Sequence, residues 1–200
     1  MKYFFLSMIL LSSVALSSCV DTTGISPLSS RKPMGNPNAF VSVVEYSDLQ
    51  CPACKTAQSV VVAPLLQQYG DRIRFEFIHF PLLSIHEYAL DAAQAAECAA
   101  DQGRFWEFID LAYDRQDELS RKVLPQWAAD TGVRDTALFS LCLASGIKKE
   151  AVMNDLDMGR EQDVAGTPTF FVDGRKTEAT LPALSAAIEE AADRVKNVPL

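Results

Sequence analysis

The stretch "SDLQCPACKTAQ", residues 47–58, joins a β-branched, apolar segment to a helical one. The segment before it, "AFVSVVEYS" (39–47), predicts a buried strand because β-branched and aromatic residues dominate it. A helix is expected from Cys51 through Tyr69, since Pro52 suits a first helical turn. Pro64 lies inside that helix and is expected to kink it. The sequence therefore places the cysteine pair at a strand-to-helix junction.

A cysteine at such a junction meets unpaired backbone N–H groups and the positive end of the helix dipole. In such settings the pKa of a cysteine falls from about 8.5 to roughly 3.5–7.5. We therefore expect Cys51 to be the exposed nucleophile, with a lowered pKa. Cys54, one turn inside the helix, is expected to resolve a mixed disulfide.

Two other uses of the pair are disfavoured. A zinc site would need more ligands, and the only histidines, His79 and His86, lie outside the usual zinc spacing. A purely structural Cys51–Cys54 disulfide would close too short a loop to reduce chain entropy much. Redox chemistry remains, and it requires no cofactor and no metal because the cysteine pair is itself the redox group.

Composition limits the class of protein. The chain has 200 residues, of which 48% are hydrophobic, so it fits one domain or one domain with an insertion. Its net charge is −8 and it has no basic tract, which argues against nucleic acid as a partner.

The N-terminal segment predicts export. Residues 1–18 contain one cation, Lys2, then an apolar run (3–16) and small residues, which is the layout of a secretory signal. The run is shorter than the roughly 20 apolar residues of a membrane-spanning helix. "LSSC" (16–19) resembles a bacterial lipobox, in which the cysteine, here Cys19, carries lipid and becomes the mature N-terminus. The alternative is a plain secretory signal with an incidental cysteine.

The rest of the chain divides into a tether and a folded part. Residues 19–38 are rich in Ser, Thr, Pro and Gly and lack apolar periodicity, so they predict a tether. A second strand is expected at 72–80 and a block of five helical segments at 84–163. The chain then ends with strands at 167–174 and about 175–179 and a helix from Pro182.

Several of these segments resemble one family. "GNPNAFVSVVEYSDLQCPAC", "FIHFPL", "AAQAAECAADQGRFWEF", "FSLCL" and "VAGTPTFFVDG" resemble the DsbA-like branch of the thioredoxin superfamily, from Gly35 to Gly174. The resemblance implies an α/β thioredoxin fold, β-α-β … β-β-α, interrupted by an all-helical insertion domain. The thioredoxin-like domain would comprise residues 39–83 and 164–198, and the insertion domain residues 84–163.

The same resemblance implies further site residues. Pro168 matches the family's cis-proline, and the backbone of Thr167 would pair with an extended substrate by strand addition. Glu45, six residues before Cys51, matches a buried acid that would take the proton from Cys54. The alternative for Glu45 is a partly exposed charge at the end of a strand.

The remaining cysteines, histidines and aromatic residues are assigned structural roles. Some DsbA-like proteins have a second disulfide, which implies a Cys98–Cys142 bridge here; the alternative is that Cys142 is a small buried hydrophobe. We expect His79 and His86 to be hydrogen-bonded structural residues rather than catalytic ones. An aromatic cluster is expected to form part of the helical core rather than a peptide groove: Phe105, Trp106 and Phe108.

The sequence thus predicts a membrane-anchored, exported thiol–disulfide oxidoreductase that donates the Cys51–Cys54 disulfide to exported proteins with free cysteines. A DsbB-type membrane oxidase, or another redox partner, would reoxidise it. One alternative is an isomerase or reductase whose pair is kept reduced. Another is a surface lipoprotein that binds a partner or a metal and has no enzymatic activity.

Overall fold

The computed structural model describes residues 24–196, so the predicted signal (1–18) and Cys19 lie outside the described residues. Its centre is a five-stranded sheet in the order β1-β3-β2-β4-β5. β2 and β3 are parallel, and the other neighbouring strands are antiparallel. The strands are β1 (Met34–Gly35), β2 (Val41–Ser47), β3 (Ile73–His79), β4 (Thr169–Val172) and β5 (Arg175–Thr177).

Helices cover both faces of the sheet. Val41 and Val43 of β2 pack with helices on one face, while Tyr46 packs on the other, as the alternation of side chains along a strand requires. The second face is covered by α7, which approaches closely at Gly159: a Cβ there would lie 2.5 Å from Phe80 Cδ2. The helices of these two layers are α1 (Pro52–Ala57), α2 (Ala63–Tyr69), α8 (Leu181–Lys196) and α7 (Lys149–Glu161).

The helical stretch after the cysteine pair is continuous but irregular. A π-helical turn, η1 (Gln58–Val62), separates α1 from α2 and ends just before Pro64. Proline has no N–H to donate within a helix, so the altered hydrogen-bond pattern at this place agrees with the disturbance expected there.

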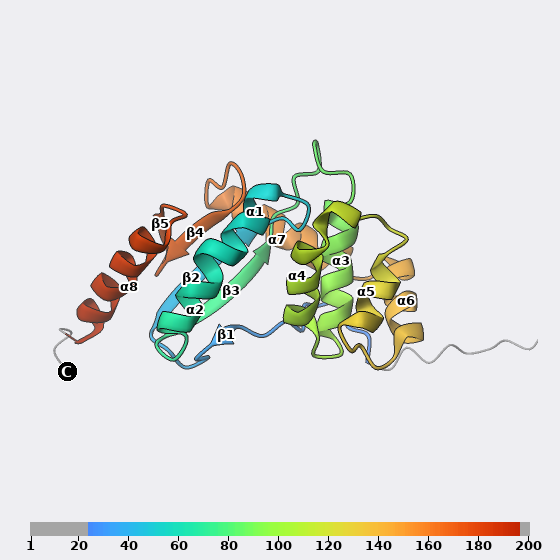
Figure 1. Ribbon diagram of the computed structural model, residues 1–200, viewed down its shortest axis with the longest axis horizontal. Coiled ribbons are helices and arrows are strands. Elements are labelled where there is room, and N and C mark those ends of the chain that lie inside the picture. Colours follow the sequence, from blue (N-terminus) through green and yellow to red (C-terminus); the bar gives the residue numbers. More distant parts are fainter. Residues whose placement is uncertain (1–23, 197–200) are drawn as a thin grey trace, which may run out of the picture.

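The remaining helices form a group beside the sheet, on the side away from α8 (Figure 1). A disulfide between Cys98 and Cys142 joins α3 to α6. Phe105 and Phe108 are buried in the core of this group, as expected, whereas Trp106 is only partly buried and also contacts the sheet. The group consists of α3 (Ala89–Ala100), α4 (Phe105–Asp114), the 3-10 turn η2 (Gln116–Glu118), α5 (Leu124–Asp130) and α6 (Thr136–Ser145).

These elements confirm the predicted fold class, an α/β thioredoxin fold with a helical insertion. α7, placed by the sequence in the insertion, begins beside α3 and continues onto β3, so it connects the two parts. The last strand is shorter than predicted, ending at Thr177, and the last helix begins at Leu181. Within residues 24–196, no helix has both the length and the apolar character needed to cross a bilayer.

The predicted tether is wrong for its described part. Residues 24–35, called the N-terminal strap below, run along the helical group and end as β1 on the edge of the sheet (Figure 1). Gly35 allows this pairing, because it has a φ of +81° and a Cβ there would lie 2.5 Å from Ile73 O. The carbonyl of Lys32 accepts a hydrogen bond from Trp106 Nε1 at 2.9 Å.

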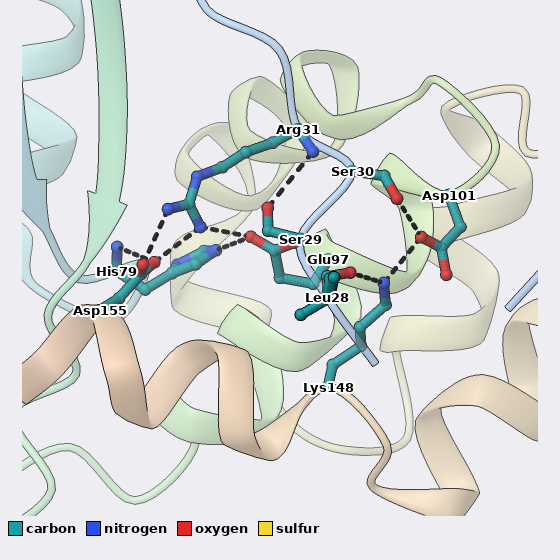
Figure 2. Close-up of polar contacts among 9 residues, drawn as sticks. All are labelled: Leu28, Ser29, Ser30, Arg31, His79, Glu97, Asp101, Lys148 and Asp155. Atoms are coloured by element: carbon teal, nitrogen blue, oxygen red, sulfur yellow. Dashed lines mark hydrogen bonds and ion pairs between the residues drawn. The ribbon is translucent and has the colours of Figure 1, made fainter. Parts of the chain in front are cut away.

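Charged groups hold the strap in place (Figure 2). Arg31 Nη1 lies 2.6 Å from both Glu97 Oε1 on α3 and Asp155 Oδ2 on α7. Lys148 donates to Leu28 O at 2.8 Å and forms an ion pair at 2.7 Å with Asp101, the C-cap residue of α3. Burial alone would raise the pKa of Glu97, but a hydrogen bond from His79 and the charge of Arg31 lower it to about 2. A pattern-based reading misses these contacts because the partners are far apart in sequence.

Candidate active site

The two site cysteines lie where the sequence places them. Cys51 is the N-cap residue of α1, with extended backbone angles (φ −79°, ψ 120°), and Cys54 follows one turn later. Both are free thiols. The expectation of an exposed Cys51 is wrong: it is 6% exposed, and Cys54 is fully buried. Both residues pack into the core of the helical group, together with Leu49.

The environment shifts the pKa values of the two thiols in opposite directions. The pKa of Cys51 is lowered to about 5, chiefly by a hydrogen bond with the Cys54 thiol, and further by Thr167 and the backbone N–H groups of Cys54 and Ala53. Burial raises the pKa of Cys54 far above its ordinary value, and the hydrogen bond that it gives to Cys51 adds to the rise. At neutral pH, Cys51 is therefore a thiolate and Cys54 is a thiol.

From the sequence, the low pKa of Cys51 is expected to come from the helix N-terminus. The backbone N–H groups do contribute, but the Cys54 thiol is the largest favourable contribution. A hydrogen bond to the charged form stabilises that form, which accounts for the direction of the shift.

The loop before β4 lies against Cys51. The Thr167–Pro168 peptide bond is cis, as the resemblance implies. Cys51 Sγ lies 3.5 Å from the Thr167 carbonyl oxygen, and the Thr169 hydroxyl donates to Gly166 O at 2.8 Å within the same loop. Thr167 and the reactive sulfur therefore lie side by side, although 116 positions apart in the chain.

Glu45 is fully buried, which excludes the alternative of a partly exposed charge at the strand end. Its Oε1 accepts a hydrogen bond from the Ser47 hydroxyl at 2.8 Å. Burial raises the pKa of Glu45 to about 7, while the bond from Ser47 opposes the rise. Both protonation states are therefore populated near neutral pH.

Two polar side chains fix the backbone between β2 and the cysteines. Asp48 accepts hydrogen bonds from the backbone N–H groups of Gln50 at 2.7 Å and Leu82 at 2.8 Å. Gln116, from the helical group, donates to Leu49 O at 2.8 Å and to Cys51 O at 3.1 Å.

Both histidines have buried carboxylate partners. His86 Nδ1 lies 2.8 Å from Asp48 Oδ2, and His79 Nε2 lies 3.3 Å from Glu97 Oε1.

Sequence reasoning missed four residues around the cysteines: Ser47, Asp48, Tyr113 and Gln116. One signal for Ser47 was present, since residues two apart on a strand share a face and Ser47 follows Glu45 by two. Tyr113 and Gln116 lie in the helical group and reach the site only through the tertiary fold. Their sequence neighbourhood contains no signal of that approach.

The fold and the cysteine pair define a thioredoxin-fold dithiol protein with a helical insertion. Three solved structures are similar to it. BdbD from Bacillus subtilis has a TM-score of 0.74 at 21% identity, over 83% of this chain and 98% of that one. Alpha-DsbA1 from Wolbachia pipientis gives 0.72 at 20%, over 84% and 94%. MdbA, a thiol-disulfide oxidoreductase from Corynebacterium diphtheriae, gives 0.61 at 17%, over 80% and 93%. These matches confirm the DsbA-like fold.

Sequence comparison assigns the family. A family model described as thioredoxin matches residues 30–190, and the chain belongs to that family. Na(+)/H(+) antiporter NhaA 3 of Salinispora tropica is 41% identical over 159 residues, which is 78% of this chain and 24% of the relative. The antiporter NhaA of Herminiimonas arsenicoxydans is 35% identical over 161 residues, 80% and 25%. The chain thus spans about a quarter of the length of the curated relatives it matches.

Proposed function

We propose that the protein is an exported thiol–disulfide oxidoreductase that donates the Cys51–Cys54 disulfide to cysteines of extracytoplasmic proteins. The observation that carries the proposal is the contrast between the two thiols: Cys51 has a pKa of about 5, and the neighbouring Cys54 has a raised one. A stabilised thiolate favours the reduced pair, so the oxidised pair readily gives up its disulfide.

The reaction has two exchange steps. A client thiolate attacks the Cys51 sulfur of the disulfide, forms a mixed disulfide with it and expels the Cys54 sulfur, which takes up a proton. A second client thiolate then attacks the client sulfur, which forms the client disulfide and releases Cys51 as a thiolate. Two electrons pass from the client to the cysteine pair.

Other residues support these steps. The backbone of Thr167 beside the sulfur would align an extended client by strand addition. Glu45, buried and titrating near 7, would exchange the proton with Cys54. No cofactor takes part in either step.

Export and anchoring form the second half of the proposal. The signal-like segment 1–18 would direct the chain out of the cytosol, and lipid on Cys19 would hold it at a membrane surface. There a DsbB-type membrane oxidase, or another electron acceptor, would reoxidise the pair. Disulfides persist in such a compartment.

Trapping the mixed disulfide tests the proposal. We expect reduced Cys54→Ser protein, activated at Cys51 as a mixed disulfide with a small thiol, to exchange that thiol for a reduced, unfolded client with a single cysteine, which has no second thiol to resolve the complex. The covalent complex would persist and would be seen by mass spectrometry and non-reducing electrophoresis. Cys51→Ser, treated alike, is the matched control and should form none. Wild-type disulfide protein should convert a two-cysteine version of the same client to its disulfide.

Equal complex formation by both variants, or an unaltered client with the wild-type protein, would contradict the proposal. The second outcome would favour a binding role for the protein.

A further inference from the structure

We propose that the Ser47 hydroxyl relays the proton between Cys54 and Glu45, and that Tyr113 of the helical group holds this hydroxyl in position. The inference rests on the proposed role of Glu45 and adds the route by which the proton travels. It makes Ser47 a catalytic residue and Tyr113 a positioning residue.

The first part of the route lies on one strand. Glu45 and Ser47 are two residues apart on β2 and share a face, so their side chains meet without any distortion. The Ser47 hydroxyl donates to Glu45 Oε1 at 2.8 Å, and both residues are fully buried. The other carboxylate oxygen, Oε2, has no hydrogen-bond partner among the described residues. Glu45 thus has Ser47 as its polar contact on the route to the sulfur.

The second part of the route joins Ser47 to the thiol. The Ser47 hydroxyl also interacts with the Cys54 sulfur, and this interaction opposes part of the rise in the Cys54 pKa. Cys54 is fully buried and sits one turn into α1. The serine therefore interacts with both the reacting sulfur and the carboxyl group.

Tyr113, from the helical group, makes the third polar contact of Ser47. It lies on α4, is 3% exposed, and its hydroxyl is 2.8 Å from Ser47 Oγ. Burial raises the pKa of Tyr113 well above its ordinary value, so the phenol stays protonated. Because the Ser47 hydrogen goes to Glu45 Oε1, the Tyr113 O–H is the donor in its hydrogen bond with Ser47. A serine oxygen donates one hydrogen bond and accepts two. With Glu45 as acceptor and Tyr113 as one donor, one acceptor site remains. The Cys54 S–H can use this site once Cys51 is in a mixed disulfide and no longer accepts that hydrogen.

Proton transfer then balances in both directions. When a client thiolate breaks the Cys51–Cys54 bond, the protonated Glu45 gives its proton to Ser47 Oγ, and Ser47 gives its own to the Cys54 thiolate. In the reverse step the Cys54 S–H proton moves to Ser47 and the Ser47 proton moves to the Glu45 carboxylate. The Cys54 sulfur then attacks Cys51 and expels the client thiolate. Ser47 ends each cycle unchanged.

The reverse step can be timed in isolation. Reduced protein is mixed with saturating oxidised glutathione, so that Cys51 forms a mixed disulfide and Cys54 then expels glutathione in a first-order step. Acid quenching and mass spectrometry follow the decay of the mixed disulfide between pH 5 and 9. In the wild type we expect the rate to rise with pH and level off above about 7, where Glu45 is ionised.

Ser47→Ala is the principal variant. Loss of the relay should lower the rate at pH 7 roughly 10²-fold, the lower end of what general acid–base catalysis supplies, and replace the plateau by a rate that keeps rising with pH. Ser42→Ala, on the same strand but the opposite face, is the matched control and should behave as the wild type. Ultraviolet absorbance of the Cys51 thiolate checks that each variant retains the site.

The outcomes separate the relay from the role of Glu45. If Glu45→Gln loses the plateau and Ser47→Ala keeps it, even shifted to higher pH, the proton bypasses Ser47 and the relay is wrong. If Glu45→Gln itself keeps the plateau, Glu45 is not the proton acceptor and the proposed function loses that component.

Tyr113→Phe supplies a second test that does not depend on how well Ser47→Ala folds. It removes one hydroxyl and leaves the ring in place. The plateau should fall about fivefold, as expected for the loss of one net hydrogen bond, with the inflection kept. Tyr69→Phe, a buried tyrosine on α2, should leave the plateau unchanged. An unaltered plateau in Tyr113→Phe would contradict the positioning role and, with it, the relay as drawn.

Discussion

Two sulfur atoms one helical turn apart have different protonation states in this site. The Cys54 thiol donates to Cys51 and stays protonated, whereas Cys51 accepts hydrogen bonds and ionises. Each pKa unit of difference corresponds to about 1.4 kcal/mol between protonation states. The contrast follows from where each residue lies, at the N-cap and one turn inside.

The sequence predicts the positions of the two cysteines and the lowered pKa of Cys51 because the motif is local. Cys51, Pro52 and Cys54 are close in sequence, and they mark both the helix start and the thiol pair that together lower the Cys51 pKa. The extent of burial was not predictable, since it depends on the loop at Thr167 and on the helical group, both distant in sequence. Glu45 was found through its spacing to Cys51 and the family resemblance.

Glu45 provides a prediction about stability. Its folded pKa, about 7, lies above the ordinary 4.5, so the folded state keeps a proton that the unfolded state has already lost. Stability contributed by protonated Glu45 is therefore present below about pH 4.5 and is lost as the pH rises to 7. The loss amounts to about 3 kcal/mol.

Glu45→Gln should not show this loss. In urea unfolding of the disulfide form, in which neither site cysteine titrates, the variant should gain about 3 kcal/mol relative to the wild type between pH 4 and 8. A difference between the two proteins that stays constant over this range would mean that the Glu45 pKa is not raised by folding.

At the scale of elements, helices and strands with strong patterns were predicted well and the strap was not. β2, β3 and the helices of the insertion have apolar periodicity or capping signals, such as Asp135, whose side chain accepts from Leu138 N at the start of α6. The strap has no such periodicity, because charge pairs and backbone hydrogen bonds hold it instead. Its edge strand, β1, has two residues, too few for any pattern.

Arg31 joins the strap to two helices, α3 and α7. Its guanidinium pairs with Glu97, fully buried, and with Asp155, whose side chain is 6% exposed. Arg31→Ala would leave both carboxylates without this partner, and breaking a buried ion pair costs about 3–5 kcal/mol. Chemical unfolding at neutral pH measures the loss.

The matched control for Arg31 is Arg160→Ala on α7. Arg160 pairs with Asp157, and both side chains are about 60% exposed, so the loss should stay below about 1 kcal/mol. Equal, small effects of the two substitutions would show that the strap contributes little to the stability of the fold.

At the scale of the whole molecule, the site belongs to both domains. The cysteines and Glu45 come from the thioredoxin part, while Tyr113 and Gln116 reach them from the helical group. The Cys98–Cys142 disulfide holds two helices of that group together, and the strap ties the group to the sheet. The insertion therefore both buries the thiols and supplies polar partners to them.

This arrangement predicts the direction of electron flow. A lowered Cys51 pKa stabilises the reduced pair and makes the disulfide more oxidising, by about 30 mV for each pKa unit when thiolate is the stabilised form. The pair should therefore be a stronger oxidant than a dithiol with ordinary pKa values.

The redox potential of the Cys51–Cys54 pair, measured by equilibration with reduced and oxidised glutathione at pH 7, tests this claim most directly. We predict a potential above about −200 mV, on the oxidising side of the thioredoxin value of about −270 mV. A value at or below that of thioredoxin would contradict the role of disulfide donor and identify the pair as a reductant.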